Sequence, residues 1–401
     1  MTATPTDARS PLPLAGLRVV EFTHMVMGPA VGAILGELGA DVVKVEPLAG
    51  DSTRTLTGSG AGYFPMYNRG KRSLALDVKD VRGRAIAERL IARADVFVEN
   101  FRAGAVDALG LGYEALASHN PRLVYCSEKG FLPGPYAHRA ALDEVAQMMG
   151  GLAYMTGPPG QPLRAGASVI DVTGGMFGVI GILAALEERH RTGRGRKVTS
   201  SLFESTAYLV GQHMAQQAVT GMAARPMPVR VSAWAVYDVF ETADGEQVFV
   251  GIVSDSQWQA FCRGFGLDAL GADPRYRSNA QRVQARATLL PTVRALFKSR
   301  TKTVLVEQLE RMGLPFAPIG RPEDLFEDPQ LLANGGLAPV TLPDGRTTRL
   351  PTVPIAFDDR RPARGGGLAR IGEHTRAILG ELGLTAAEIE ALERDHVVRL
   401  G

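Results

Sequence analysis

Asp171 has the sequence context best suited to chemistry. It follows a run of small and apolar residues at 165–170 and directly precedes an apolar stretch, expected to be helical from near Thr173. One interpretation is structural, because Asp is a preferred N-cap residue that stabilises a helix by about 1 kcal/mol. The other is catalytic: at a helix N-terminus a carboxylate stays ionised in apolar surroundings, and without water it can attack a carbonyl or thioester. The two interpretations are compatible.

Basic residues gather where strands of the predicted sheet end. Open α/β sheets bind ligands at the carboxyl ends of their strands, so a phosphate-bearing ligand is expected there. The residues concerned are Lys71, Arg72, Lys79 and Arg102. A second basic group, at 189–197, is interpreted as the solvated end of a helix, where cations suit the helix dipole.

Asn100 and Phe101 follow the strand expected at 96–100. The simpler interpretation of Phe101 is a loop aromatic that packs on the core. The alternative is that a planar ligand group stacks on Phe101 while Asn100 donates or accepts a hydrogen bond nearby.

Several other chemistries lack their motifs. The turn at 23–29 carries a single glycine instead of G-x-G-x-x-G, which disfavours a dinucleotide site. The seven histidines are scattered without H-x-H or H-E-x-x-H spacing, so no metal site is predicted. Neither a G-x-S-x-G elbow nor a Walker A pattern occurs. Forty-four Lys+Arg against 42 Asp+Glu give no basic field for nucleic acid.

The cysteine count and the apolar pattern indicate a cytoplasmic protein. Cys126 and Cys262 cannot form a disulfide framework, which indicates a reducing compartment. No signal-peptide pattern is visible at the N-terminus. The longest apolar stretch, at 172–186, is shorter than the roughly 20 residues that span a bilayer. We therefore expect neither membrane nor nucleic-acid partners.

Strands and helices alternate along the first half of the chain, which predicts an α/β fold with an open, doubly wound parallel sheet. The composition changes near Gly221, where a Pro- and Met-rich run is interpreted as a linker. Beyond it, turns at 243–245 and 343–345 predict hairpins, and a helical tail follows. Strands are expected at 17–22, 42–46, 73–77, 96–100, 123–127 and 197–202, and helices at 81–93 and 174–190.

Long motifs resemble one family, the class III CoA-transferases (the formyl-CoA transferase and carnitine CoA-transferase group). They include LAGLRVVEFTHMVMGPA, LGADVVKVEP, NRGKRSLALDVKD, VFVENFRAG, NPRLVYCSEKGF and GILAALEERHRTGRGRKV. The resemblance covers nearly the whole chain and is densest at 17–202. It implies an interlocked homodimer. Each chain would have a Rossmann-like large domain at 1–220, a smaller α/β domain at 221–330 and a return to the large domain at 331–401.

The resemblance also implies a set of site residues. Asp171 matches the family nucleophile, and Asp143 matches an acid that lines the active site. The loop that contacts the thiol end of CoA is matched by His24, Met25 and Val26. The nucleotide end is matched by Leu76, Lys79, Asn100 and Phe101. Pro47 and Ala108 stand where some members have basic residues, so phosphate binding is expected to rest more on Lys71, Arg72, Lys79 and Arg102.

The implied activity is transfer of CoA from an acyl-CoA donor, expected to be succinyl-CoA, to a small carboxylic acid. The expected intermediates are a mixed anhydride and an aspartyl-CoA thioester, with CoA as substrate and no permanently bound cofactor. Backbone N–H groups near Gly174 and Gly175 are expected to stabilise the oxyanion. The run at 226–231 lacks the glycines that formyl-CoA transferases carry in a mobile loop, which disfavours formate and oxalate.

Two other functions stay open. The first is that of an α-methylacyl-CoA racemase-like isomerase, in which a His–Asp motif supplies one base. Here Leu142 precedes Asp143, and a leucine cannot move a proton, which favours the transferase. The second is a CoA-binding protein without chemistry, in which Asp171 only caps a helix.

Overall fold

The computed structural model describes residues 11–230, 232–362 and 365–401. These divide into two compact units, one formed by Met1–Pro228 with Phe326–Gly401 and the other by Val229–Leu325. The chain thus leaves the first unit and later returns to it. Residues 1–10, part of the N-terminal stretch that shows no signal-peptide pattern, and Val231, in the run without glycine, lie outside the described residues.

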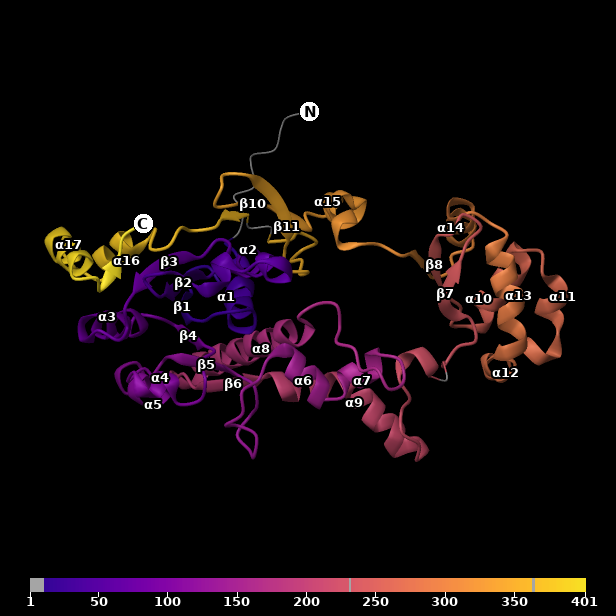
Figure 1. The fold of residues 1–401 in the computed structure, drawn as a ribbon, viewed down its shortest axis with the longest axis horizontal. Helices are drawn as coiled ribbons and strands as arrows, with labels where there is room; N and C mark the ends of the chain where they lie inside the picture. The colour runs from indigo at the N-terminus through magenta and orange to yellow at the C-terminus, as the bar shows by residue number, and fades with distance from the viewer. Residues whose placement is uncertain (1–10, 231, 363–364) are drawn as a thin grey trace. The chain divides into compact units, whose positions relative to one another are not determined.

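The first unit is built on a sheet of seven strands, as far as the chain is described, in the order β13-β3-β2-β1-β4-β5-β6 (Figure 1). β1 to β6 pair in parallel, and β13 runs antiparallel to β3. The expected α/β fold with a large, mostly parallel sheet is confirmed. The strands are β1 Arg18–Phe22, β2 Asp41–Glu46, β3 Arg72–Leu76, β4 Val96–Glu99, β5 Val124–Lys129, β6 Lys197–Ser201 and β13 Val398–Arg399.

Both faces of this sheet are apolar, which is why its strands read as continuous hydrophobic runs. Val31 and Leu35 of α1 pack with Val179 and Ile182 of α8 against one face. α3, α16 and α17 cover the opposite face. These helices are α1 Met27–Glu37, α3 Val81–Ile91, α8 Val169–Thr192, α16 Thr375–Glu381 and α17 Ala386–Arg394.

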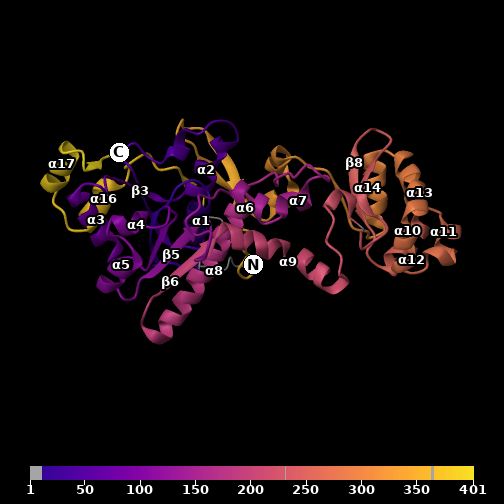
Figure 2. The ribbon, with the colours of Figure 1, turned by 60° about the horizontal axis from the view of Figure 1, so that its bottom comes forward.

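Shorter elements lie around the sheet. They are α2 Tyr63–Asn68, α4 Ala105–Ala108, α5 Tyr113–His119, α6 Asp143–Met149, α7 Leu152–Thr156 and α15 Pro329–Ala333. β10 Leu337–Thr341 pairs with β11 Thr347–Pro351 around the predicted turn at 343–345, and β12 Gly366–Gly367 joins β10. α9, Leu202–Thr220, follows β6 and leads away from the sheet (Figure 2). The sequence patterns did not predict α9.

The second unit has a small antiparallel sheet in the order β7-β8-β9, and its hairpin turns at the predicted 243–245. Trp258, Phe261 and Phe297 are fully buried in its core. Its strands are β7 Tyr237–Glu241, β8 Gln247–Gly251 and β9 Phe316–Pro318. Its helices are α10 Asp255–Gly264, α11 Asp268–Ala272, α12 Asn279–Gln284, α13 Arg286–Lys298 and α14 Lys302–Arg311.

α8 begins earlier than predicted, at Val169 instead of near Gly174, and its N-cap position is Ser168. By length and composition it is the one helix of the described residues that could cross a membrane, with a mean hydropathy of 2.0 over its most apolar window. It packs closely on α1, β5 and β6, so a place in the core explains the part of its apolar window that is buried, 44% of it.

The backbones of α1 and α8 approach each other so closely that a side chain does not fit between them. A Cβ added at Gly175 would lie 2.8 Å from the carbonyl oxygen of Met27 and 3.2 Å from the Cβ of Ala30. The side chain of Met27 packs on Gly174 in the same way. The start of α1 and the first turns of α8 are therefore neighbours.

We predict that Gly175→Ala destabilises the protein by about 1–3 kcal/mol, because the new methyl group meets backbone atoms that cannot rotate away. Gly380→Ala is the matched control, since the corresponding position in α16 has open space around it. There alanine should stabilise the helix by up to about 1 kcal/mol. Denaturation midpoints check both. Equal stability of Gly175→Ala and the wild type would contradict the close approach.

Candidate active site

Asp171 lies in the first turn of α8, two residues after its first residue, so the N-cap interpretation is wrong. The carboxylate of Asp143, the first residue of α6, binds this helix end instead. Its Oδ2 accepts hydrogen bonds from the backbone N–H of Ile170 (2.8 Å) and of Asp171 (3.0 Å). Asp143 therefore satisfies two N–H groups that have no partner within the helix, and it fixes the backbone at Asp171.

The electrostatic surroundings of Asp171 disfavour its charge. Burial raises the pKa of Asp171 to about 7, and the like charges of Asp143 and Glu144 add to the rise, while Arg164 opposes it. The sequence argument, in which the helix dipole keeps the carboxylate ionised, therefore gave the wrong direction. Burial and a carboxylate already bound at the helix end outweigh the dipole.

Three residues that the sequence analysis missed support this acid cluster. Arg164 forms an ion pair with Glu144, and its Nη2 lies 3.8 Å from Oδ1 of Asp143. Gln147, one turn further along α6, donates to Asp143, and its Oε1 accepts the backbone N–H of Ala165 (2.8 Å). The i,i+4 spacing of Asp143 and Gln147 was the signal in the sequence that could have identified Gln147 as a partner of Asp143.

Tyr67 of α2 belongs to the same neighbourhood. Burial raises the pKa of its phenol, and the charge of Asp171 raises it further. The hydroxyl of Tyr67 thus stays protonated at neutral pH and can donate a hydrogen bond within electrostatic reach of Asp171.

The loop of His24, Met25 and Val26 follows β1 and runs directly into Met27, the residue that packs on Gly174. The amide of Asn100 holds this loop: its Oδ1 accepts the backbone N–H of His24 (2.9 Å), and its Nδ2 donates to the His24 carbonyl (2.8 Å). β1 and β4, whose ends carry these residues, lie where the strand order reverses, the usual ligand crevice of such sheets.

Phe101 lies beside this loop, with its ring centroid 5.4 Å from that of His24, and it is 38% exposed. Two residues that the sequence analysis missed fix its backbone. Glu99 accepts the N–H of Phe101 (3.0 Å), and Lys129 donates to its carbonyl (2.6 Å). Lys129 also forms an ion pair with Glu99 at 2.7 Å. The backbone of Phe101 is thus fixed, while its side chain stays partly exposed.

The predicted basic residues separate into two groups. Lys79 and Arg102 are exposed just after the carboxyl ends of β3 and β4. Lys71 and Arg72 are at the opposite, amino-terminal end of β3. The ammonium of Lys71 is buried and donates to Glu21 (2.7 Å) and to the carbonyl of Pro29 (2.9 Å).

Two of the candidates are therefore unsuited to contact with a phosphate. Arg72 pairs with Asp41 and Glu381, and Lys71 is already neutralised by Glu21, because both side chains start from the wrong end of the strand. Leu76 ends β3 and is 2% exposed, so it packs in the core. In the part of the chain that the structure describes, no three His, Cys, Asp or Glu side chains gather as a metal site requires.

Asp171→Asn is expected to stabilise the protein increasingly as the pH rises. The folded-state pKa of Asp171 is raised to about 7, so folding loses stability as the pH rises from the unfolded value near 4 through 7. The asparagine avoids this loss, and the gain reaches at most about 4 kcal/mol at pH 8 and is smaller at pH 5. Melting temperatures at the two pH values measure the difference.

Glu310→Gln, at an exposed position of α14, is the control and should change neither melting temperature. A pH-independent effect of Asp171→Asn would contradict the raised pKa.

Comparison with known proteins places this site in a family. The model of CoA-transferase family III matches residues 14–375. The chain is 34% identical over 383 residues to succinyl-CoA:glutarate CoA-transferase of Mus musculus, covering 94% of this chain and 88% of that one. It is also 34% identical to succinate–glutarate CoA-transferase of Agrobacterium fabrum, covering 95% and 97%.

A solved structure agrees with this result. The crystal structure of a CAIB/BAIF family protein from Brucella suis has a TM-score of 0.81 and 35% identity, over 93% of this chain and 100% of that one. The motif resemblance is thereby confirmed: the chain belongs to CoA-transferase family III and is an enzyme that transfers CoA.

Proposed function

We propose that the protein moves CoA from an acyl-CoA donor to a small carboxylic acid through covalent intermediates on Asp171. One observation carries the proposal. The Asp171 carboxylate is largely buried in the first turn of α8, near Gly174, on which Met27 packs directly after the loop at 24–26. Within the described residues no hydrogen bond or ion pair engages its oxygens. A carboxylate without partners is free to act as a nucleophile.

The first half of the reaction loads CoA onto the enzyme. An oxygen of Asp171 attacks the thioester carbonyl, the C–S bond breaks, and a mixed anhydride and the CoA thiolate result. The thiolate then attacks the aspartyl carbonyl, which releases the donor acid as a carboxylate and leaves an aspartyl-CoA thioester. No proton is gained or lost, but the site must exclude water because the anhydride hydrolyses.

The second half repeats these steps in reverse order. The acceptor carboxylate attacks the aspartyl thioester, and the thiolate leaves. The thiolate then attacks the acceptor acyl group of the new anhydride, so that the new acyl-CoA forms and the Asp171 carboxylate is restored. Because Asp171 must be ionised to begin, its pKa of about 7 makes the first step faster as the pH rises through neutrality.

The oxyanion of each tetrahedral intermediate needs a donor other than the one expected from sequence. Gly174 and Gly175 lie inside α8, where their N–H groups serve the helix, and the N–H groups of Ile170 and Asp171 serve Asp143. The protonated hydroxyl of Tyr67 is our candidate, since it lies within electrostatic reach of Asp171.

For CoA itself, we propose that the loop of His24, Met25 and Val26 contacts the thiol end and that the ring of Phe101 stacks on the adenine. The exposed Lys79 and Arg102 are the candidates for phosphate binding. Asn100 acts through the loop that it holds. Lys71 and Arg72 leave this set because they are paired elsewhere.

The substrates are proposed from the relatives. Those of Mus musculus and Agrobacterium fabrum are named for succinyl-CoA or succinate and glutarate, and that of Haloarcula marismortui for succinyl-CoA and mesaconate. We propose succinyl-CoA as donor and a small dicarboxylic acid as acceptor. A relative from Streptomyces avermitilis is a formyl-CoA:oxalate CoA-transferase, so a screen of acceptors should include oxalate.

We also propose a homodimer, interlocked through a small domain at 221–330 and a return at 331–401. An apolar face on two helices supports the second copy. Met176, Ile180 and Leu183 of α8 recur at helical spacing and are 49%, 58% and 38% exposed. On the neighbouring α9, Tyr208 and Met214 are 73% and 65% exposed. We also propose a cytoplasmic location, because the two cysteines are free and buried, as expected in a reducing compartment.

Asp171→Ala is expected to abolish CoA transfer while CoA binding, measured by calorimetry, stays close to that of the wild type. In the wild type with succinyl-CoA, hydroxylamine should trap an aspartyl hydroxamate at Asp171, visible by peptide mass analysis. Asp268→Ala removes an acid from the first turn of α11 and should keep full activity. Transfer by Asp171→Ala, or solvent deuterium at the acyl α-carbon without acyl exchange, would reject the nucleophile in favour of the isomerase.

Ile180→Asp is expected to hinder assembly of the dimer during folding, because it places a charge in the apolar face of α8 and α9. The purified variant should then sediment as a monomer in sedimentation velocity. Val304→Asp on α14, at a position 44% exposed, is the control and should leave the mass unchanged. A wild-type protein that sediments as a monomer would rule the dimer out.

A further inference from the structure

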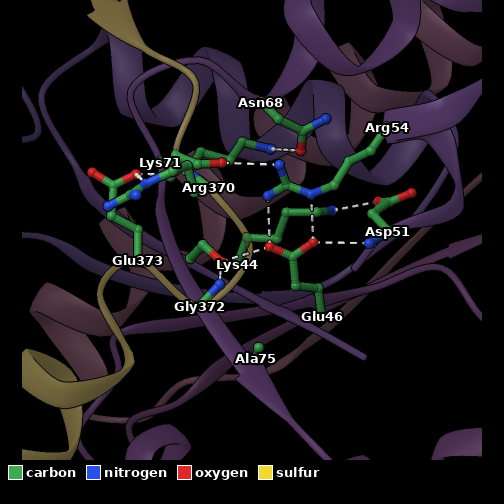
Figure 3. Close-up of polar contacts among 12 residues, drawn as sticks. Lys44, Glu46, Asp51, Arg54, Asn68, Lys71, Ala75, Arg370, Gly372 and Glu373 are labelled. Carbon is green, nitrogen blue, oxygen red and sulfur yellow. Dashed lines mark hydrogen bonds and ion pairs between the residues drawn. The ribbon is translucent and has the colours of Figure 1, made fainter. Parts of the chain in front are cut away.

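A buried ion pair lies under the loop that carries His24. Nζ of Lys44, on β2, is 2.8 Å from Oδ2 of Asp51, and the two side chains are 2% and 1% exposed (Figure 3). The same ammonium donates to the backbone carbonyl of Thr23 at 2.8 Å. Lys44 therefore connects the end of β2 to the residue just before His24.

Asp51 is itself held firmly. Its backbone N–H donates to Glu46 (2.8 Å), and its Oδ1 accepts the N–H and hydroxyl of Thr53 at 2.8 and 2.7 Å. Its second oxygen is thereby aimed at Lys44. The ammonium thus has a fixed partner on one side and the Thr23 carbonyl on the other, a geometry that a flexible surface lysine could not maintain.

The loop needs such an anchor because its backbone is unusual. Met25 has φ +62°, a left-handed conformation that a side chain other than Gly, Asn or Asp rarely adopts. Asn100 fixes His24, and Lys44 fixes Thr23, so the residues before Met25 are held by two independent contacts. A strained residue persists only when its surroundings determine it in this way.

The same pair acts on the charge of His24. Burial lowers the pKa of His24; the negative charge of Asp51 raises it, and the positive charge of Lys44 lowers it. These are the charged groups that act on the ring, and the ring of Phe101 faces it from the loop after β4. The two members of the ion pair thus have opposite effects on one imidazole.

We propose that Lys44 and Asp51 are positioning residues for His24: Asp51 holds the ammonium of Lys44, and Lys44 fixes the loop through the carbonyl of Thr23. This inference rests on the proposed contact between the loop and the thiol end of CoA. That arm of CoA is uncharged, so an uncharged imidazole can pack against it without the cost of burying an unpaired cation.

The test is the titration of His24, followed by the NMR signal of its ring in three variants. Lys44→Met should raise the pKa of His24 by about one unit, and Asp51→Asn should lower it by a similar amount. If the pair only supported the fold, both variants would loosen the loop and expose the ring, and the pKa of His24 would rise in both.

Arg54→Met is the matched control. Arg54 is a cation at the same strand end that pairs with Glu46 (2.7 Å) and donates to the carbonyl of Ala369, and no hydrogen bond joins it to the described residues of the loop (Figure 3). Its loss should leave the pKa of His24 unchanged. If Lys44→Met does not fold, the isosteric Asp51→Asn decides the question alone.

The pH dependence of KM distinguishes a failure of this inference from a failure of the proposed function. KM for acyl-CoA should rise at low pH as His24 gains its proton, and in Lys44→Met this rise should begin about one pH unit higher, with a smaller change in kcat. The positioning role is overturned if the pKa of His24 rises in both Lys44→Met and Asp51→Asn, or if it does not change in Asp51→Asn. Opposite shifts in the pKa of His24, together with a KM for acyl-CoA that does not depend on pH, would instead reject the contact between the loop and CoA.

Discussion

The close approach of α1 and α8 is the constraint on which the site depends. Only a hydrogen atom fits at Gly175, because the carbonyl of Met27 occupies the space of a side chain. This contact brings the first turn of α8, and with it Asp171, next to the loop that leaves β1. The two elements are more than 140 residues apart in the sequence, so the proximity of the acid and the loop is a product of helix packing and not of any local motif.

This arrangement disfavours the charged form of Asp171. The side chain of Asp171 is largely buried near two other carboxylates, and one of them, Asp143, already occupies the positive end of the helix. A carboxylate that has little contact with solvent, and whose oxygens form no hydrogen bond with the described residues, is poorly stabilised as an anion, which is the property that a nucleophile needs. Asp143 therefore holds the backbone in place and at the same time keeps its neighbour reactive.

Much of the fold could be predicted because buried parallel strands are continuous apolar runs separated by helical patterns. The strands at 18–22, 41–46 and 96–99 appear within a residue or two of the expected positions. The start of α8 was not predictable in the same way. Ser168 stands at the N-cap, but its side chain makes no capping hydrogen bond, and the carboxylate of Asp143 on another helix binds the helix end instead.

Sequence reasoning located candidate residues whose proposed role follows from their own type and position. It missed residues whose role depends on the side chains that they contact. His24 and Phe101 follow strand ends as expected, and Asp171 lies near the N-terminus of α8, although the helix begins two residues before it. Lys71 looked like a phosphate ligand, but Glu21, from a strand two positions away in the sheet, already neutralises it. Arg164 and Lys129 were missed because their importance comes from the carboxylates they meet, and these are distant in sequence.

The interruption of the first unit by Val229–Leu325 has a consequence for synthesis of the chain on the ribosome. α16, α17 and β13 complete one face and one edge of the large sheet, yet they emerge only after the whole second unit. At about 5–20 residues per second, the free edge of β3 and its uncovered apolar face must wait many seconds for their partners. During that interval the nascent chain is open to strand pairing with other chains, and chaperones that bind apolar segments have their natural target there.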